Sequence, residues 1–147
     1  VSNLMGQKRE DQVIKLVKRI SLWSILFCAV MVSILNVFPE MFFRLFGQSE
    51  DFVKEGIPVI RMVSTSIMFM SIANIWLNAV TGTGKTKVNL AIEIVAITLY
   101  LAHTWYFMKY NYVSLAVAWS NELIYWGSIF IMASIFIYSK RWKTKHP

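Results

Sequence analysis

A glycine-rich segment at residues 79–87, AVTGTGKTK, contains residue types that can bind a nucleotide phosphate. It matches the phosphate-loop signature G-x-x-x-x-G-K-[ST] at residues 84–86, but Ala79 occupies the position of the first glycine. A phosphate loop also needs a strand before it, so that free backbone N–H groups converge on the phosphates. Here a run typical of a membrane helix precedes the segment. We therefore interpret it as a tight turn in which Gly82 and Gly84 take positive φ and end a helix.

Two acidic residues, Glu93 and Glu122, lie within long apolar runs. A carboxylate at bilayer depth costs at least about 2.5 kcal/mol, so such residues face a protein interior or a wet cavity and are functional candidates. For Glu122 the alternatives are titration during function and a simple hydrogen bond between helices. Trp119 and Trp126 are near it in the sequence and offer aromatic faces to a cationic compound.

Glu93 and two asparagines have both a functional and a structural interpretation. Glu93 either couples to an ion or is neutralised by snorkelling or by pairing with Lys87. Asn74 and Asn78 are four residues apart and share a helix face, where amides join helices more often than they contact a substrate. We keep all three as candidates for coupling or substrate contact.

No catalytic constellation accompanies these residues. Two histidines and one cysteine give no metal-ligand spacing, and the sequence contains no credible Ser/His/Asp set. We expect neither an enzyme nor a metal site.

The elements that must position these residues follow from the composition. Hydrophobic residues make up 56% of the 147, only 16% are charged, and the mean hydropathy is +0.52. A helix needs about 20 apolar residues to cross a bilayer. Four runs meet this length, at about 20–38, 62–80, 88–108 and 112–138. The sequence predicts an all-α membrane protein with four transmembrane helices in a single domain, 1–147.

The distribution of basic residues predicts the orientation. Most of them lie before the first run, between the second and third runs, and after the fourth: Lys8, Arg9, Lys15, Lys18, Arg19, Lys85, Lys87, Lys140, Arg141, Lys143 and Lys145. By the positive-inside rule, both ends of this multi-pass protein face the cytoplasmic side of the cell (inner) membrane. The net charge of +7 then favours anionic lipid, and nucleic-acid binding is not expected.

Shorter segments complete the prediction. Residues 1–19 form a cytoplasmic amphipathic segment whose part at 11–20 lies along the membrane surface, and 139–147 form a basic cytoplasmic tail with Trp142 as an interfacial anchor. In the outer loop Ser49 caps a helix, and a bend follows at residues 56–58.

Four segments, in this order along the chain, resemble the C-terminal part of the multidrug and toxic compound extrusion (MATE) family. They are VSNLMGQKREDQVIKLVKRI, FPEMFFRLFGQSEDFVKEGIPVIRM, NAVTGTGKTK, which is similar to the family's GxGDT turn, and LAVAWSNELIYWGSIFIMASIFIYSKRWK. Lys85 stands where many members have aspartate. The run 62–80 lacks the acid that some branches carry, so no sodium site is transferred.

The resemblance implies that the four spans are helices nine to twelve of a twelve-helix transporter and belong to one six-helix lobe. It implies exchange of Na⁺ or H⁺ for drugs by alternating access, with no cofactor beyond the coupling ion. The implied partners are the lipid bilayer, cationic or amphiphilic small molecules, and the N-terminal lobe with helices seven and eight of the parent chain. A lipid-linked glycan flippase and a non-transporting four-helix scaffold remain alternatives.

Overall fold

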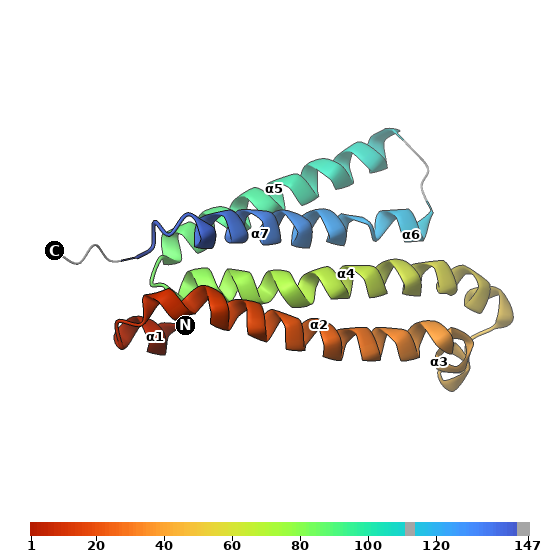
Figure 1. The fold of residues 1–147 in the computed structure, drawn as a ribbon. Coiled ribbons are helices and arrows are strands. Elements are labelled where there is room, and N and C mark those ends of the chain that lie inside the picture. The colour runs from red at the N-terminus through yellow and green to blue at the C-terminus, as the bar shows by residue number, and fades with distance from the viewer. Residues whose placement is uncertain (111–113, 144–147) are drawn as a thin grey trace.

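The computed structural model describes residues 1–110 and 114–143, and this part of the chain consists of helices and connecting turns (Figure 1). The predicted start of the fourth span at Tyr112 and the end of the basic tail, 144–147, lie outside the described residues. Within the described part, four segments are long and apolar enough to cross a membrane. The predicted fold class, an all-α membrane protein with four membrane-capable helices, is confirmed.

The four long segments are α2 (Val13–Val37), α4 (Glu50–Gly82), α5 (Thr86–Tyr110), and α6 (Leu115–Ala118) followed by α7 (Asn121–Tyr138). The short elements are α1 (Ser2–Gly6), a 3₁₀ turn (Glu10–Gln12) and α3 (Pro39–Leu45). Because α6 and α7 together form the fourth span, that span is interrupted at residues 119–120.

The helices are not arranged in sequence order. They pack in the order α2, α4, α7, α5 (Figure 1). The last helix in the sequence, α7, therefore lies between α4 and α5. The N-terminus, the α4–α5 turn and the end of α7 lie at one end of the bundle, whereas α3 and α6 lie at the other. We call these the turn end and the α3 end.

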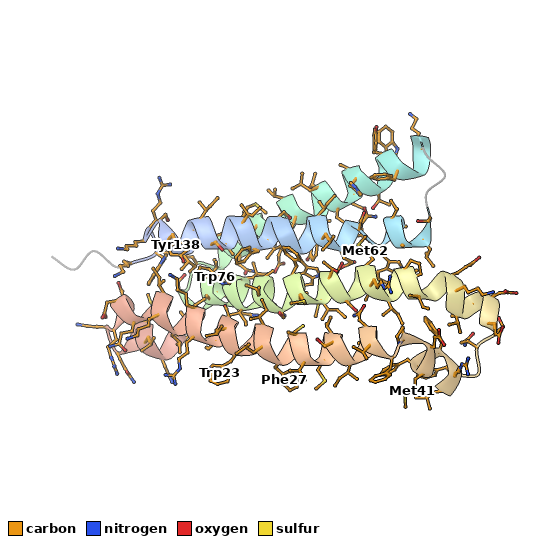
Figure 2. The ribbon with its side chains drawn as sticks, turned by 45° about the vertical axis from the view of Figure 1, so that its right-hand side comes forward. Trp23, Phe27, Met41, Met62, Trp76 and Tyr138 are labelled. Carbon is orange, nitrogen blue, oxygen red and sulfur yellow. The ribbon has the colours of Figure 1, made fainter. Side chains whose placement is uncertain are left out.

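The core lies mainly between α4 and α7. The ring of Trp76 from α4 contacts Phe130 edge to face, with centroids 5.9 Å apart, and lies 5.4 Å from the ring of Tyr138 (Figure 2). Ala73 and Ala133 are fully buried, and such small side chains let membrane helices approach closely. In contrast, Trp23 and Phe27 of α2 point away from the bundle, where lipid contact suits them (Figure 2).

Two predictions for the turn end were wrong. Residues 11–20 do not lie along the membrane surface before a turn, because α2 continues unbroken from Val13 through the first span. Val13 and Val17 are 0% and 1% exposed, so their apolar face packs into the bundle and not onto lipid. Trp142 is likewise buried, and its Nε1 donates to the carbonyl of Ile137 at 2.8 Å, so it closes the core and is not an interfacial anchor.

The glycine-rich turn joins two helices, as expected of a structural turn. Gly84 has φ of +79°, a conformation that glycine adopts without strain. The prediction of positive φ for Gly82 was wrong, because Gly82 is the last helical residue of α4. Its role is steric: a Cβ there would come within 2.7 Å of Val1 Cβ, so the missing side chain lets α1 approach.

At the α3 end, Ser49 caps α4 as predicted, and its hydroxyl accepts from the Phe52 N–H at 3.4 Å. The bend predicted at residues 56–58 is not a helix boundary, because α4 runs through Pro58 as one helix of 33 residues. The helix capped by Ser49 and the second predicted span, 62–80, are therefore one continuous element.

Candidate functional site

Polar side chains gather where α5 packs on the start of α7. The fourth span breaks after α6, where the Ser120 hydroxyl donates back to the carbonyl of Val117 at 2.6 Å. This break places Asn121 and Glu122 in the first turn of α7. Glu122 was expected ten residues into an unbroken span. It lies instead in the first turn of α7, where the N–H groups of Glu122 and Leu123 donate to the carbonyls of Trp119 and Ser120 at 3.2 and 3.0 Å.

Asn121 is the centre of a hydrogen-bonded group that the sequence analysis did not single out. Its side chain is only 8% exposed. Its amide N–H donates to Thr104 Oγ1 at 2.8 Å, and its carbonyl oxygen accepts from His103 Nδ1. Thr104 in turn donates to the carbonyl of Tyr100 at 2.9 Å. Asn121 therefore ties the start of α7 to the C-terminal half of α5.

Glu122 borders a small open cavity. Trp126 Nε1 donates to Glu122 Oε2 at 3.0 Å, so the two predicted site residues do come together. The cavity, of about 290 Å³, is lined by Tyr100, Ala118, Trp119, Asn121 and Glu122. Trp119 is exposed. A carboxylate, an indole face and a phenol ring thus surround one space, which is a suitable environment for an organic cation.

Glu93 is held by a different set of partners. Asn89 donates its amide N–H to Glu93 Oε1 at 2.9 Å, and the Asn89 carbonyl oxygen accepts from Thr81 Oγ1 at the same distance. Within the described residues Lys87 forms no ion pair with Glu93, so the pairing considered as an alternative does not occur. The carboxylate instead accepts from the Asn89 amide, which the Thr81 hydroxyl holds in place.

Tyr125 lies on α7, three residues after Glu122. The ring of Tyr125 also lies edge to face with Tyr100 and with Trp126, at centroid distances of 6.2 and 4.9 Å. Within the described residues the two carboxylates have separate partners, Asn89 for Glu93 and Trp126 for Glu122. We call Glu93, Tyr100, Asn121, Glu122 and Tyr125 the α5–α7 polar cluster.

Asn74 and Asn78 do not join this cluster. Asn78 donates its amide N–H to the Asn74 side-chain oxygen at 2.7 Å and to the Asn74 carbonyl at 2.8 Å. Both side chains are exposed on the surface of α4, so in the described structure they connect no two helices. The sequence was correct that they share a face, but that face is separate from the cavity at Glu122.

Comparison with known proteins identifies the family. Residues 1–106, which form α1 to most of α5 and include the glycine-rich turn and Glu93, match the MatE family model. No match was found among curated proteins or solved structures. The match covers most of the chain, and four membrane-capable helices agree with a multi-helix transporter. The chain therefore belongs to the MatE family of membrane transporters.

Proposed function

We propose that this chain is part of a secondary active multidrug efflux transporter that exchanges Na⁺ or H⁺ for cationic or amphiphilic small molecules by alternating access. The observation that carries the proposal is the α5–α7 polar cluster, which contains two carboxylates inside membrane-capable helices. Carboxylates in such positions commonly belong to ion or substrate pathways. Glu122, which borders the cavity, is the proposed exchange residue.

The exchange follows from the chemistry of one carboxylate. When Glu122 is ionised, its charge and the indoles of Trp119 and Trp126 attract a cationic compound into the cavity. When a proton or Na⁺ neutralises that charge, the attraction is lost and the compound leaves. The ion and the compound therefore exclude each other. The hydrogen bond from Trp126 keeps the carboxylate aimed at a fixed position while either one is bound.

The proposed transporter contains more helices than the four described. We place these four as helices nine to twelve of a twelve-helix protein, in one six-helix lobe, with helices seven and eight and the N-terminal lobe as partners. Both ends are proposed to be cytoplasmic in the cell (inner) membrane, which agrees with the position of the N-terminus and of the end of α7 at the same end of the bundle.

The test is transport by the full-length protein in proteoliposomes. Efflux of ethidium is measured under a pH gradient and, separately, under a Na⁺ gradient. Glu122→Gln should reduce gradient-driven efflux at least tenfold, whereas Glu122→Asp should retain part of it because it keeps the charge. Glu55→Gln is the matched control, since Glu55 is an exposed carboxylate of α4 that lies outside the cavity. Full efflux by Glu122→Gln would overturn the proposed role.

The same vesicles distinguish drug efflux from the alternative function, translocation of a lipid-linked glycan. The charged residue of the Glu122 cavity is an acid, which repels the phosphate groups of a lipid-linked glycan. We therefore expect no translocation of a fluorescent lipid-linked sugar by these vesicles. Translocation of that lipid without any ion gradient, together with no ethidium efflux, would favour the flippase instead.

A further inference from the structure

A second pocket, of about 750 Å³, opens at the α3 end of the bundle, between α2, α3 and α4. It lies apart from the α5–α7 polar cluster and shares no lining residue with the Glu122 cavity. Its charged lining residues are Glu40 and Arg44 from α3 and Arg61 from α4. Apart from Asn36, its other lining residues are apolar, so the pocket combines cationic and hydrophobic surface.

The charge balance of this pocket favours an anion. Arg44 and Glu40 approach to 3.9 Å, but their side chains are 71% and 63% exposed, so the pair is weak. Within the described residues Arg61 forms no ion pair with an acidic group. One positive charge therefore remains uncompensated in the pocket. Guanidinium groups bind phosphate oxygens through two parallel hydrogen bonds, which makes arginine well suited to that ligand.

The walls of the pocket are held by specific packing. The ring of Phe43 from α3 stacks edge to face on Phe52, with centroids 5.8 Å apart. It also occupies the space beside Gly56, where a Cβ would come within 2.3 Å of the ring. On the side of α2, Asn36 donates to Ser64 Oγ at 2.8 Å. The folded-back α3 and the end of α2 are thus both fixed against α4.

The position of the pocket identifies the source of the anion. Exposed apolar side chains surround it on α3 and its flanks: Phe38, Met41, Leu45 and Phe46. A short helix with such a face at the end of two spans suits the bilayer interface. Figure 2 shows Met41 at this end of the bundle. Phospholipid phosphates occupy that depth, and their acyl chains lie beside the spans.

We propose that this pocket binds the phosphate of an anionic phospholipid, such as phosphatidylglycerol, from the adjoining leaflet. Arg61 and Arg44 contact the phosphate, and the apolar lining contacts the glycerol and the upper acyl chains. Binding attaches the α3 end to the membrane surface. The site is independent of the proposed exchange at Glu122, so either inference can fail without the other.

Native mass spectrometry of the full-length protein tests the site, after incubation with an equimolar mixture of phosphatidylglycerol and phosphatidylcholine. Arg61→Gln should bind phosphatidylglycerol about fivefold more weakly, because one charge-assisted contact to phosphate is lost. Lys54→Gln, an equal charge change at an exposed residue outside the pocket, should bind it as the wild type does. Excess inorganic phosphate should not displace the lipid.

A second variant tests the shape of the pocket without changing its charge. Gly56→Ala displaces the Phe43 ring and with it the α3 wall, so it should also weaken phosphatidylglycerol binding. Equal binding by the wild type and Arg61→Gln, or an equal loss in Lys54→Gln, would overturn the proposal. Displacement by inorganic phosphate would also overturn it, since the pocket would then be a site for free anions.

Discussion

We expect the uncharged residue Asn121 to contribute strongly to the stability of the packing between α5 and α7. Replacing Asn121 with alanine removes its hydrogen bonds to His103 and Thr104 while leaving both helices intact. The Thr104 hydroxyl keeps its bond to the Tyr100 carbonyl, so no buried hydroxyl proton is left without an acceptor. The main loss is therefore the two links between helices.

The magnitude follows from the number of these links. A hydrogen bond between membrane helices contributes about 0.6 kcal/mol on average and up to about 1.7 kcal/mol. Because Asn121 is nearly fully buried, we expect about 1 kcal/mol for each bond, which is above this average. Asn121→Ala should lower the free energy of unfolding by about 2 kcal/mol.

The assay is reversible unfolding of the full-length protein in mixed micelles, with the fraction of SDS as the denaturing variable. Asn78→Ala is the matched control, because the same side chain is removed from an exposed position whose bonds remain within α4. It should change the free energy by no more than about 0.5 kcal/mol. A double-mutant cycle of Asn121→Ala with Thr104→Val should give a coupling of about 1 kcal/mol.

Two results would refute this reasoning. The first is an Asn121→Ala variant that is no more destabilised than Asn78→Ala, because the links at Asn121 would then contribute nothing to the packing of α5 on α7. Alternatively, a coupling energy of zero in the cycle would show that Asn121 and Thr104 do not interact in the folded protein.

The remaining predictions concern the turn and the core. Gly84→Ala should lower the free energy of unfolding by about 1 kcal/mol, because φ of +79° is strained for alanine. Gly127→Ala is its control in the same SDS titration. It should leave the free energy unchanged, because the position is helical and a Cβ there meets no other atom. Trp76→Ala should cost about 3 kcal/mol, because the ring contacts with Phe130 and Tyr138 are lost and a void remains. A smaller loss than that of Asn121→Ala would contradict the α4–α7 core.

Much of the fold was predictable from the sequence because single helices carry their own signals. The length and apolarity of the runs gave the four spans, and Ser49 with its acidic first turn gave the start of α4. The boundary of α2 was not predictable in this way. An apolar face at residues 13–17 suits a membrane surface and a helix partner equally well, and only the three-dimensional packing shows that Val13 and Val17 are buried.

The candidate site was predicted in part. Glu122 and Trp126 are four residues apart on one helix, so the sequence alone brings them together. The position of α7 between α4 and α5 is a property of the whole bundle, and no local pattern encodes it. For that reason two contacts between α5 and α7 could not be found from spacing: the ring contact of Tyr125 with Tyr100, and the hydrogen bond of Asn121 with His103. The one available signal was the polar pair Asn121 and Glu122 after a short apolar segment.

The most direct test of the proposed transporter is whether a cationic compound and the coupling ion exclude each other at Glu122. Binding of tetraphenylphosphonium to the full-length protein is measured in weakly buffered detergent solution, with the pH recorded, and again at increasing Na⁺. We predict that binding releases protons or becomes weaker as the Na⁺ concentration rises. Glu122→Gln should show neither effect. Binding that releases no protons and does not respond to Na⁺ would contradict exchange at this site.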